Sequence, residues 1–235
     1  MLVCKNVNFF ETKNKPEQII SNEKSFKHWT REDLSKTLNL NATKNLNELK
    51  DWLANDECLS EQEIDFLNRL ATRSADIIDA WNEAELMQKF INKVIDLIDF
   101  DLSQYRCTYF VERYLSATIQ DITLHGYANW MVAKGIQQPS NPFFFMHEYK
   151  PEGEKQIDGR GQLLALMLAT QALNKDNYPI YGCYIHGRMW FFVVLKGLSY
   201  EISRSFDATR QEELQQIAKI LRKQKNMIVS RLENI

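Results

Sequence analysis

The chain has 235 residues, of which 44% are hydrophobic and 26% are charged, and its formal net charge at pH 7 is −2. This length suits one large domain, or one domain with a smaller extension, and the hydrophobic content is enough for a substantial core. The charge excludes a basic surface over the whole molecule, but it leaves room for a local basic groove of the kind that contacts nucleic acid.

Cysteine spacing and the lack of long apolar runs indicate where the protein works. Cys4, Cys58, Cys107 and Cys183 are far apart, and without a C-x-x-C pair they do not predict a zinc site. We expect no signal peptide, because the N-terminal sequence has no apolar stretch followed by a cleavage site. No run approaches the roughly 18 apolar residues of a membrane span. We therefore expect a soluble, reduced, cytoplasmic protein that makes no membrane contact.

The first part of the chain predicts helices. Residues 1–28 are polar and rich in Asn and Lys, which is compatible with an edge strand and loop or with partial disorder. Residues 30–100 read as helical, with capping-box signals in "TRED" at Thr30 and "SEQE" at Ser60.

The texture then changes to strands. Aromatic and β-branched residues dominate 105–150, in "YFVERYLSATI", "ITLHGYANWMVA" and "PFFFMHEYK". Residues 158–174, "DGRGQLLALMLATQALN", are apolar nearly all round and predict a buried helix. "YPIYGCYIHGRMWFFVVLKGLSYEIS" predicts three strands with His-Gly and Lys-Gly turns between them. From Asp207 the chain predicts one long helix.

This order predicts an α/β protein with a mixed central sheet flanked by helices. We divide the chain into a helical N-terminal region, a core and a C-terminal long helix, at 1–75, 76–206 and 207–235.

The long C-terminal helix has an apolar stripe and a basic segment. The stripe is expected either to pack on the sheet or to pair with a partner chain; it consists of Leu214, Ile217, Leu221, Ile228 and Leu232. The segment "KILRKQK" suits a nucleic-acid backbone patch or a solvated helix face; its cations are Lys219, Arg222, Lys223 and Lys225.

The strand that ends in "HEYK" finishes with two charged residues. Glu148 and Lys150 are two positions apart, so in a regular strand they project from the same face. Strand alternation puts Phe144 and Met146 on that face, and the opposite face then holds Phe143, Phe145, His147 and Tyr149. Taken alone, an acidic residue two positions before a lysine is more often a surface salt bridge at a strand end than a functional site.

Four segments together resemble the PD-(D/E)XK nuclease superfamily, over about Asn82 to Leu195. They are "WNEAELMQKFINKVIDLI", "GYANWMVAKG", "HEYKPE" and "GQLLALMLATQ". Their order is a glutamate-bearing helix, a hairpin that carries E-x-K, and a crossover helix, and "YGCYIHGRMWFFVVL" fits the strands that complete such a sheet. The resemblance implies a restriction-endonuclease-like core in a bacterial nuclease-like protein, and such domains often serve defence or repair.

The resemblance also implies a chemistry. Carboxylates of such a site hold Mg²⁺ (or Mn²⁺), which polarises a phosphodiester and lowers the pKa of an attacking water. Glu148 would be a metal ligand, Lys150 the catalytic lysine that orients the water or stabilises developing charge, and Glu83 the helix glutamate near the metal.

Two further residues are weighed by their helical positions. Steps of three and four from Glu83 reach apolar Met87, Phe90 and Val94, whereas the steps from Glu85 reach a polar face. Glu83 is therefore either a site carboxylate or an acid that favours the helix N-terminus. Gln162 opens the buried helix, where it suits a helix-end hydrogen bond or a contact with the site's lysine, water or phosphate.

One position departs from the family pattern. Where the resemblance implies an aspartate as metal ligand, this chain has Asn129, which register places opposite 147 or 148 if the two strands pair antiparallel. Asp121 is the nearest aspartate, about 26 Å away along an extended strand at roughly 3.3 Å per residue. An asparagine offers one neutral oxygen, so metal binding is expected to be weaker.

The other candidate functional residues give weaker evidence for a site. The histidines show no metal-ligand spacing; they are His28, His125, His147 and His186. Cys107 and Cys183 read as buried core. "DGRGQ" lacks the Lys-Ser/Thr of a nucleotide loop, but its helix N-terminus, with Arg160 and Lys155, suits a phosphate.

Three functions remain open at this point. The first is Mg²⁺-dependent hydrolysis of nucleic acid, with DNA as the expected substrate. The second is a nuclease-fold binding or assembly subunit that has lost hydrolysis through Asn129. The third is an unrelated fold in which E-x-K is accidental. A homo-oligomer or a larger protein assembly is compatible with each.

Overall fold

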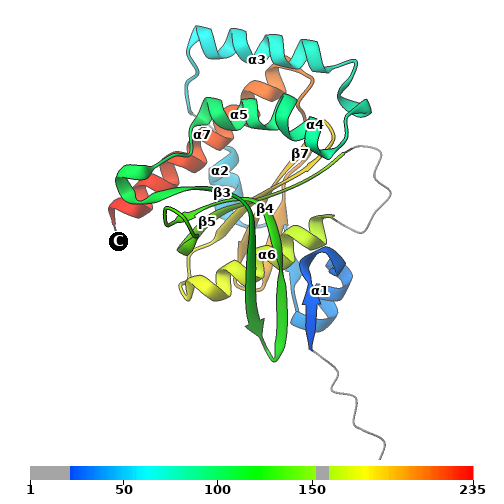
Figure 1. The fold of residues 1–235 in the computed structure, drawn as a ribbon, viewed down its shortest axis with the longest axis vertical. Helices are drawn as coiled ribbons and strands as arrows, with labels where there is room; N and C mark the ends of the chain where they lie inside the picture. The colour runs from blue at the N-terminus through cyan, green and yellow to red at the C-terminus, as the bar shows by residue number, and fades with distance from the viewer. Residues whose placement is uncertain (1–21, 55, 152–158, 235) are drawn as a thin grey trace, which may run out of the picture.

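The computed structural model describes residues 22–54, 56–151 and 159–234. Within these ranges nine strands form one mixed sheet, in the order β1-β4-β5-β6-β7-β8-β2, with β3 on β4 and β9 on β7 (Figure 1). The strands are β1 (Glu23–Ser25), β2 (Asn41–Ala42), β3 (Cys107–Ile119), β4 (Ile122–Lys134), β5 (Ser140–Lys150), β6 (Ile180–His186), β7 (Met189–Lys196), β8 (Ser199–Ile202) and β9 (Phe206–Asp207). The predicted mixed sheet is thus confirmed.

Helices cover both faces of the sheet, as Figure 1 shows. α6, with α1 beside it, lies on one face, and α2, α3, α4, α5 and α7 lie on the other. The helices are α1 (Arg31–Leu38), α2 (Asn47–Leu53), α3 (Glu61–Ser74), α4 (Glu83–Leu86), α5 (Asn92–Ile98), α6 (Gly159–Asn174) and α7 (Gln211–Glu233). Short 3₁₀ turns are η1 (Phe26–His28), η2 (Ile78–Ala80) and η4 (Ser103–Tyr105), and η3 (Met87–Ile91) is a π-helical turn that joins α4 to α5.

The two capping boxes expected from the sequence are present. The Thr30 hydroxyl accepts a hydrogen bond from the Asp33 N–H at 3.0 Å, and the Asp33 carboxylate accepts one from the Thr30 N–H. Ser60 and Glu63 make the same reciprocal pair at the start of α3. These bonds satisfy backbone donors that a helix N-terminus leaves unpaired.

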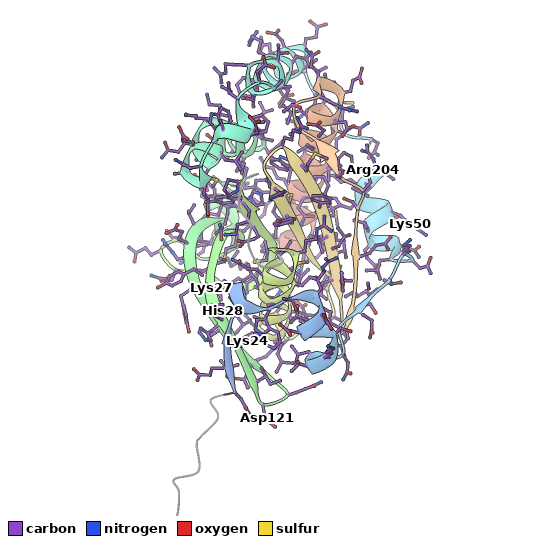
Figure 2. All side chains as sticks on the ribbon, turned by 90° about the vertical axis from the view of Figure 1, so that its right-hand side faces the viewer. Lys24, Lys27, His28, Lys50, Asp121 and Arg204 are labelled. Atoms are coloured by element: carbon purple, nitrogen blue, oxygen red, sulfur yellow. The ribbon has the colours of Figure 1, made fainter. Side chains whose placement is uncertain are left out.

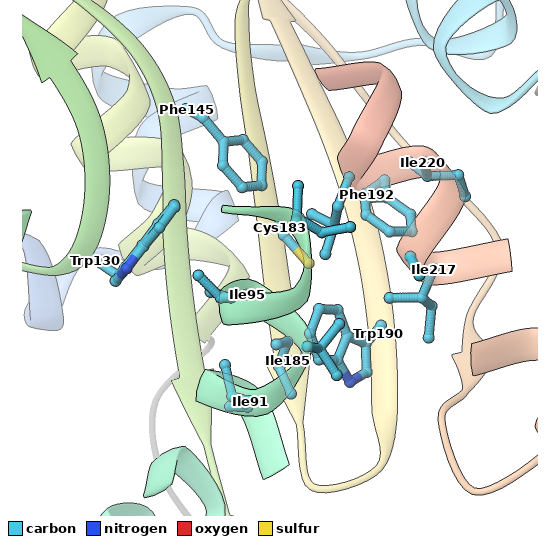
Figure 3. Packing of buried hydrophobic residues seen from close by; sticks show 14 of the residues in the cluster. Ile91, Ile95, Trp130, Phe145, Cys183, Ile185, Trp190, Phe192, Ile217 and Ile220 are labelled. Atoms are coloured by element: carbon cyan, nitrogen blue, oxygen red, sulfur yellow. The ribbon is translucent and has the colours of Figure 1, made fainter. Parts of the chain in front are cut away.

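Two separate cores lie on the two sides of the sheet. The core on the α7 side joins Trp130, Phe145, Cys183 and Trp190 of the strands to isoleucines of α5, η3 and α7 (Figure 3). The core on the α6 side is mostly aliphatic and buries most of α6 itself. α6 therefore reads as apolar all round because it packs against the sheet on one side and against η1 and α1 on the other.

The hairpin of β3 and β4 is long and bends near its middle. Val111 pairs with Trp130 and Arg113 with Ala128, so Glu112 and Asn129 lie opposite each other, but this pair is missing from the ladder. Glu112 has a φ of 48°, a conformation that residues other than glycine rarely adopt. Before Glu112, the β3 side chains that face α6 are at even-numbered positions, as at Phe110. After Glu112 they are at odd-numbered positions, as at Leu115.

The register of β4 and β5 agrees with the expectation at the site and departs from it at the other end. Trp130 pairs with His147 at the end of the ladder, so Asn129 and Glu148 are the next residues beyond the last pair. The expected faces of Phe143 and Phe144 were wrong: Phe143 packs on the α6 side and Phe144 on the α7 side. A β-bulge explains this correction, because Val132 pairs with Phe145 but Ala133 with Phe143, so Phe144 has no partner on β4.

β5 and β6 are parallel and are joined through α6. The strands after α6 form the two predicted hairpins, with Gly187 and Gly197 at the turns; their φ angles of 55° and 58° are left-handed and favour glycine.

α7 packs within its own chain. The five predicted stripe residues are all buried. Three of its four predicted cations bind neighbouring elements: Arg222 pairs with Glu63 at 2.5 Å, Lys223 donates to the Ala54 carbonyl and Lys225 to the Ile98 carbonyl. In the described part of the chain, no helix has the length and apolar character that crossing a membrane requires.

Candidate functional site

Five side chains singled out from the sequence come together at one end of β5. Glu83 is the first residue of α4, Asn129 lies in β4, Glu148 and Lys150 end β5, and Gln162 is in the first turn of α6. Four separate elements thus meet at this point, although up to 79 residues separate their side chains in sequence, from 83 to 162.

Lys150 is the centre of the cluster. Its Nζ lies 3.5 Å from Oε1 of Glu148 and 3.8 Å from Oε2 of Glu83. The Asn129 amide donates a hydrogen bond from Nδ2 to Oε1 of Glu83 at 3.3 Å. One ammonium therefore faces two carboxylates, and the asparagine joins one of them.

The backbone around Lys150 is fixed from two sides. Lys150 is in register with His186 of the parallel strand β6, and its carbonyl accepts a hydrogen bond from the Gly187 N–H at 2.8 Å. The turn between β6 and β7 thus holds the last residue of β5 in place. This explains why Lys150 keeps strand geometry although it is the last residue of β5.

Glu83 and Gln162 are positioned by the helix starts that carry them. Asn82 caps α4, with its side chain accepting from the Glu85 N–H at 3.0 Å, so the first turn and Glu83 are held. Glu85 itself forms an ion pair with Lys89 on the surface. At the start of α6, a Cβ on Gly161 would come within 2.4 Å of the Trp29 carbonyl oxygen, so only glycine allows this close approach beside Gln162.

Glu148 is fully buried, and neither carboxylate oxygen has a hydrogen-bond partner among the described residues. Burial raises the pKa of Glu148 to about 8, and the charge of Glu83 adds to this effect, whereas nearby Lys150 and Gln162 oppose it. The Gln162 amide favours the ionised form without making a hydrogen bond of good geometry. A buried carboxyl group with an ion-pair partner at 3.5 Å but no hydrogen bond is unusual and invites a ligand that would satisfy it.

The cluster contains oxygen ligands of the kinds that Mg²⁺ takes. No group of three or more His, Cys, Asp or Glu side chains in the described ranges is placed to hold a metal ion. The cluster offers two carboxylates, from Glu83 and Glu148, and the amide oxygen of Asn129. Mg²⁺ is commonly held by one or two carboxylates together with substrate phosphates and waters, so this ligand set suits a cation bound jointly with a phosphodiester.

A pocket of about 590 Å³ opens onto the cluster. Asn129, Lys150 and Gln162 form its inner end. Its outer part is lined by η1 and by the bent half of the β3–β4 hairpin, including Lys27, His28, Tyr114, His125 and Tyr127. His28 and His125 lack metal-ligand spacing in the sequence, and no sequence pattern singled out the two tyrosines.

The other candidates from the sequence lie elsewhere. Asp121 sits at the β3–β4 turn, at the far end of the hairpin from Asn129 (Figure 2), as its sequence distance implied. Arg160 lies over the Phe191 ring, at 4.3 Å from its centroid, and Lys155 lies outside the described residues. Cys107 and Cys183 are buried, and burial raises the pKa of both thiols.

His147 is buried on the opposite face from Glu148, as expected. It lies among the rings of Trp130, Tyr149 and Trp190, and neither ring nitrogen has a hydrogen-bond partner among the described residues. Burial lowers the pKa of His147 to about 3, so it is neutral at physiological pH.

Comparison of the chain with models of known protein families found no match, and comparison with curated proteins found none either.

Proposed function

We propose that this protein hydrolyses phosphodiester bonds of nucleic acid, with DNA as its substrate, at the cluster of Glu83, Asn129, Glu148, Lys150 and Gln162. We further propose that β4, β5, α6 and β6 form the restriction-endonuclease-like core implied by the resemblance to PD-(D/E)XK nucleases. The parallel pair of β5 and β6 joined through α6 supports this proposal.

The observation that carries the proposal is the state of Glu148. Its carboxyl group is fully buried without a hydrogen-bond partner among the described residues, yet it lies 3.5 Å from the ammonium of Lys150, a residue that lines a pocket. A residue kept for stability would be expected to have its polar atoms satisfied. Perturbed carboxyl groups of this kind cluster at functional sites.

The roles of the residues follow from their chemistry. Glu148, Glu83 and Oδ1 of Asn129 would hold Mg²⁺ or Mn²⁺, which when bound polarises the phosphate and lowers the pKa of the attacking water. Lys150 can donate a hydrogen bond to a phosphate oxygen or to that water, and Gln162 can orient either one. The side chains of α4, β4, β5 and α6 thereby fix the phosphate from several directions.

The reaction is a hydrolysis and needs no further reactant. The water oxygen bonds to phosphorus while the bond between phosphorus and the leaving sugar oxygen breaks. The water gives up one proton and the leaving oxygen gains one. The Lys150 ammonium stabilises the negative charge that develops on the phosphate oxygens.

A specific observation favours a second candidate, a nucleic-acid-binding or assembly subunit that no longer cuts. Nδ2 of Asn129 donates a hydrogen bond to the Glu83 carboxylate, whereas an aspartate at this position would add a second negative charge beside it. With one charge fewer, the cation is held less tightly. Binding without hydrolysis would then be the remaining activity.

The test is cleavage of labelled single- and double-stranded DNA and RNA in Mg²⁺ and in Mn²⁺. Wild type, Lys150→Ala and Asn129→Asp are compared, with Lys134→Ala as the matched control because Lys134 is the last residue of β4 as Lys150 is of β5. Cleavage by wild type and Lys134→Ala, but not by Lys150→Ala, supports hydrolysis at this site.

Two other results would point away from it. Cleavage by Asn129→Asp alone would establish the second candidate, a disarmed nuclease whose present role is binding. Equal cleavage by wild type and Lys150→Ala, or silence from every variant, would contradict the assignment of the site.

A further inference from the structure

The outer part of the pocket at the site is lined by exposed rings and cations. Tyr114 and Tyr127 are 53% and 64% exposed, although both lie in the middle of strands. They stand directly opposite each other on β3 and β4, with ring centroids 5.5 Å apart and the planes at 69°. The His125 ring lies 6.1 Å from that of Tyr114 and extends the aromatic lining along β4.

Positive charge borders these rings. Lys27 and His28 of η1 are exposed beside the hairpin (Figure 2), and Lys27 forms no ion pair with any described residue. Lys150 supplies a second ammonium at the inner end of the pocket, where it is paired with the Glu83 and Glu148 carboxylates. None of the described residues that line the pocket is acidic. The pocket therefore suits a polyanion that also carries flat apolar faces.

The bend of the hairpin explains why the rings point this way. At Glu112 and Asn129 the strand pairing is interrupted, and the outer half of the hairpin follows with its side-chain alternation shifted. β1 pairs with this outer half, with Ser25 opposite His125, and so brings η1 and Lys27 alongside. The aromatic rings, the free lysine and the Lys150 cluster thus form one continuous lining.

We infer that this lining holds an unpaired nucleic-acid strand, with bases stacked on Tyr127 and Tyr114 and phosphates at Lys27 and Lys150. The inference rests on the proposed function, which it sharpens from nucleic acid in general to single-stranded substrate. Base faces are available for stacking only when a strand is unpaired, because a duplex buries them against neighbouring bases. A volume of about 590 Å³ lies within the roughly 300–1,000 Å³ of ordinary ligand pockets, so it suits a nucleotide unit rather than a duplex.

The test measures binding apart from cleavage. Fluorescence anisotropy of a short labelled single strand, of the same strand in a duplex, and of the RNA counterpart is recorded in EDTA, with the full chain. The variants are Tyr127→Ala and Tyr127→Phe, and Tyr178→Ala serves as the matched control because Tyr178 is 54% exposed and lies outside this pocket.

The expected result is preferential binding of the single strand, with the DNA and RNA arms showing which sugar is accepted. Tyr127→Ala should weaken single-strand binding by about 5- to 100-fold, which is the effect typical of one stacking residue. Tyr127→Phe keeps the ring and should stay within about twofold of wild type, as should Tyr178→Ala.

Two contrary results distinguish a failure of the stacking surface from a failure of the proposed hydrolysis. Equal affinity for duplex and single strand, or unchanged binding by Tyr127→Ala, overturns the stacking surface even if the protein cuts duplex DNA. Tyr127-dependent binding of single strands without any cleavage supports the surface and contradicts the proposed hydrolysis.

Discussion

Two adjacent residues at the end of β5 are buried in opposite ways. His147 faces the α7 side, among the rings of Trp130 and Trp190, and no charged group contributes to its pKa shift. Glu148 faces the α6 side, 3.5 Å from the ammonium of Lys150, which lines a pocket. Both lack a hydrogen-bond partner among the described residues.

The difference shows how burial alone and burial within a charged cluster lead to different chemistry. The histidine is held neutral in a dry aromatic core, where it acts as a flat side chain that fills space. The carboxyl group has a pKa of about 8, so it changes charge near physiological pH, and it lies beside groups that stabilise its ionised form. Only the second arrangement can respond to a cation or a phosphate.

The largest expected effect separates these residues by activity. Glu148→Gln keeps the shape of the side chain but removes its charge, and should lower cleavage by about 10²–10³-fold, comparable to the loss of one electrostatic group in an active site. His147→Phe should cut within about twofold of wild type. Rates under single-turnover conditions measure both, and equal losses in the two variants would contradict the comparison.

Stability as a function of pH should separate the two residues by the sign of the slope. Because the pKa of Glu148 is raised from 4.5 to about 8, the folded state keeps a proton that the unfolded state releases, so stability falls as pH rises from 4.5 to 8. Because the pKa of His147 is lowered from 6.5 to about 3, stability falls as pH drops from 6.5 towards 3.

Replacing either residue should remove its own contribution to the pH dependence of stability. Urea unfolding across this pH range should show Glu148→Gln losing the decline above pH 4.5 and His147→Phe losing the decline below pH 6.5, each on the order of 5 kcal/mol. If both variants kept the wild-type pH profile, the two buried groups would not have the pKa values that we assign to them.

Gly161→Ala tests how closely α6 must approach η1 to form the site. An exposed helical glycine replaced by alanine usually gains up to about 1 kcal/mol of stability. Here the new Cβ would come within 2.7 Å of the Thr30 Cα, so we expect a loss of about 1–3 kcal/mol in the free energy of unfolding. Thermal or urea unfolding measures it, and a gain in stability would show that the approach is looser than described.

The smallest effect concerns the cations of α7 on the other side of the sheet. The Arg222 guanidinium holds the pKa of Glu63 at about 2 and joins α7 to the start of α3, so Arg222→Ala should lose about 1 kcal/mol of stability. Lys219→Ala is the control, with an expected change below about 0.5 kcal/mol. Neither should alter single-strand affinity; a clear loss with either would restore the reading of α7 as a nucleic-acid surface.

Much of the fold was predictable because local signals agreed with tertiary structure. The capping boxes at Thr30 and Ser60, the Gly187 and Gly197 turns and the buried α6 all follow from short patterns with a physical cause. Strands β2 and β9 were not predicted, because two residues carry no periodicity, whereas β1 lies within residues 1–28, where an edge strand was one of the alternatives. The bulge at Phe144 was missed because a run of three phenylalanines hides the change of face.

The part of the site that depends on the register of β4 and β5 was predictable, whereas the part that depends on the bend of the β3–β4 hairpin was not. Pairing of Trp130 with His147 follows from the hairpin, and it brings Asn129 to Glu148. The exposure of Tyr114 and Tyr127 depends on the bend at Glu112 and on the packing of η1 beside β4, and alternation along β3 and β4 does not predict either. The departure of Glu112 from ordinary strand geometry has no signature in its sequence neighbours.

Calorimetric titration with Mn²⁺ tests the central claim most directly, because it reports the buried carboxyl group without requiring cleavage. Wild type should bind more tightly at pH values above 8, where Glu148 is ionised, than at pH 6.5, and Asn129→Asp should bind more tightly than wild type. Glu148→Gln should lose binding at both pH values. Indistinguishable titrations of wild type and Glu148→Gln would contradict the claim that Glu148 is the centre of a cation-dependent site.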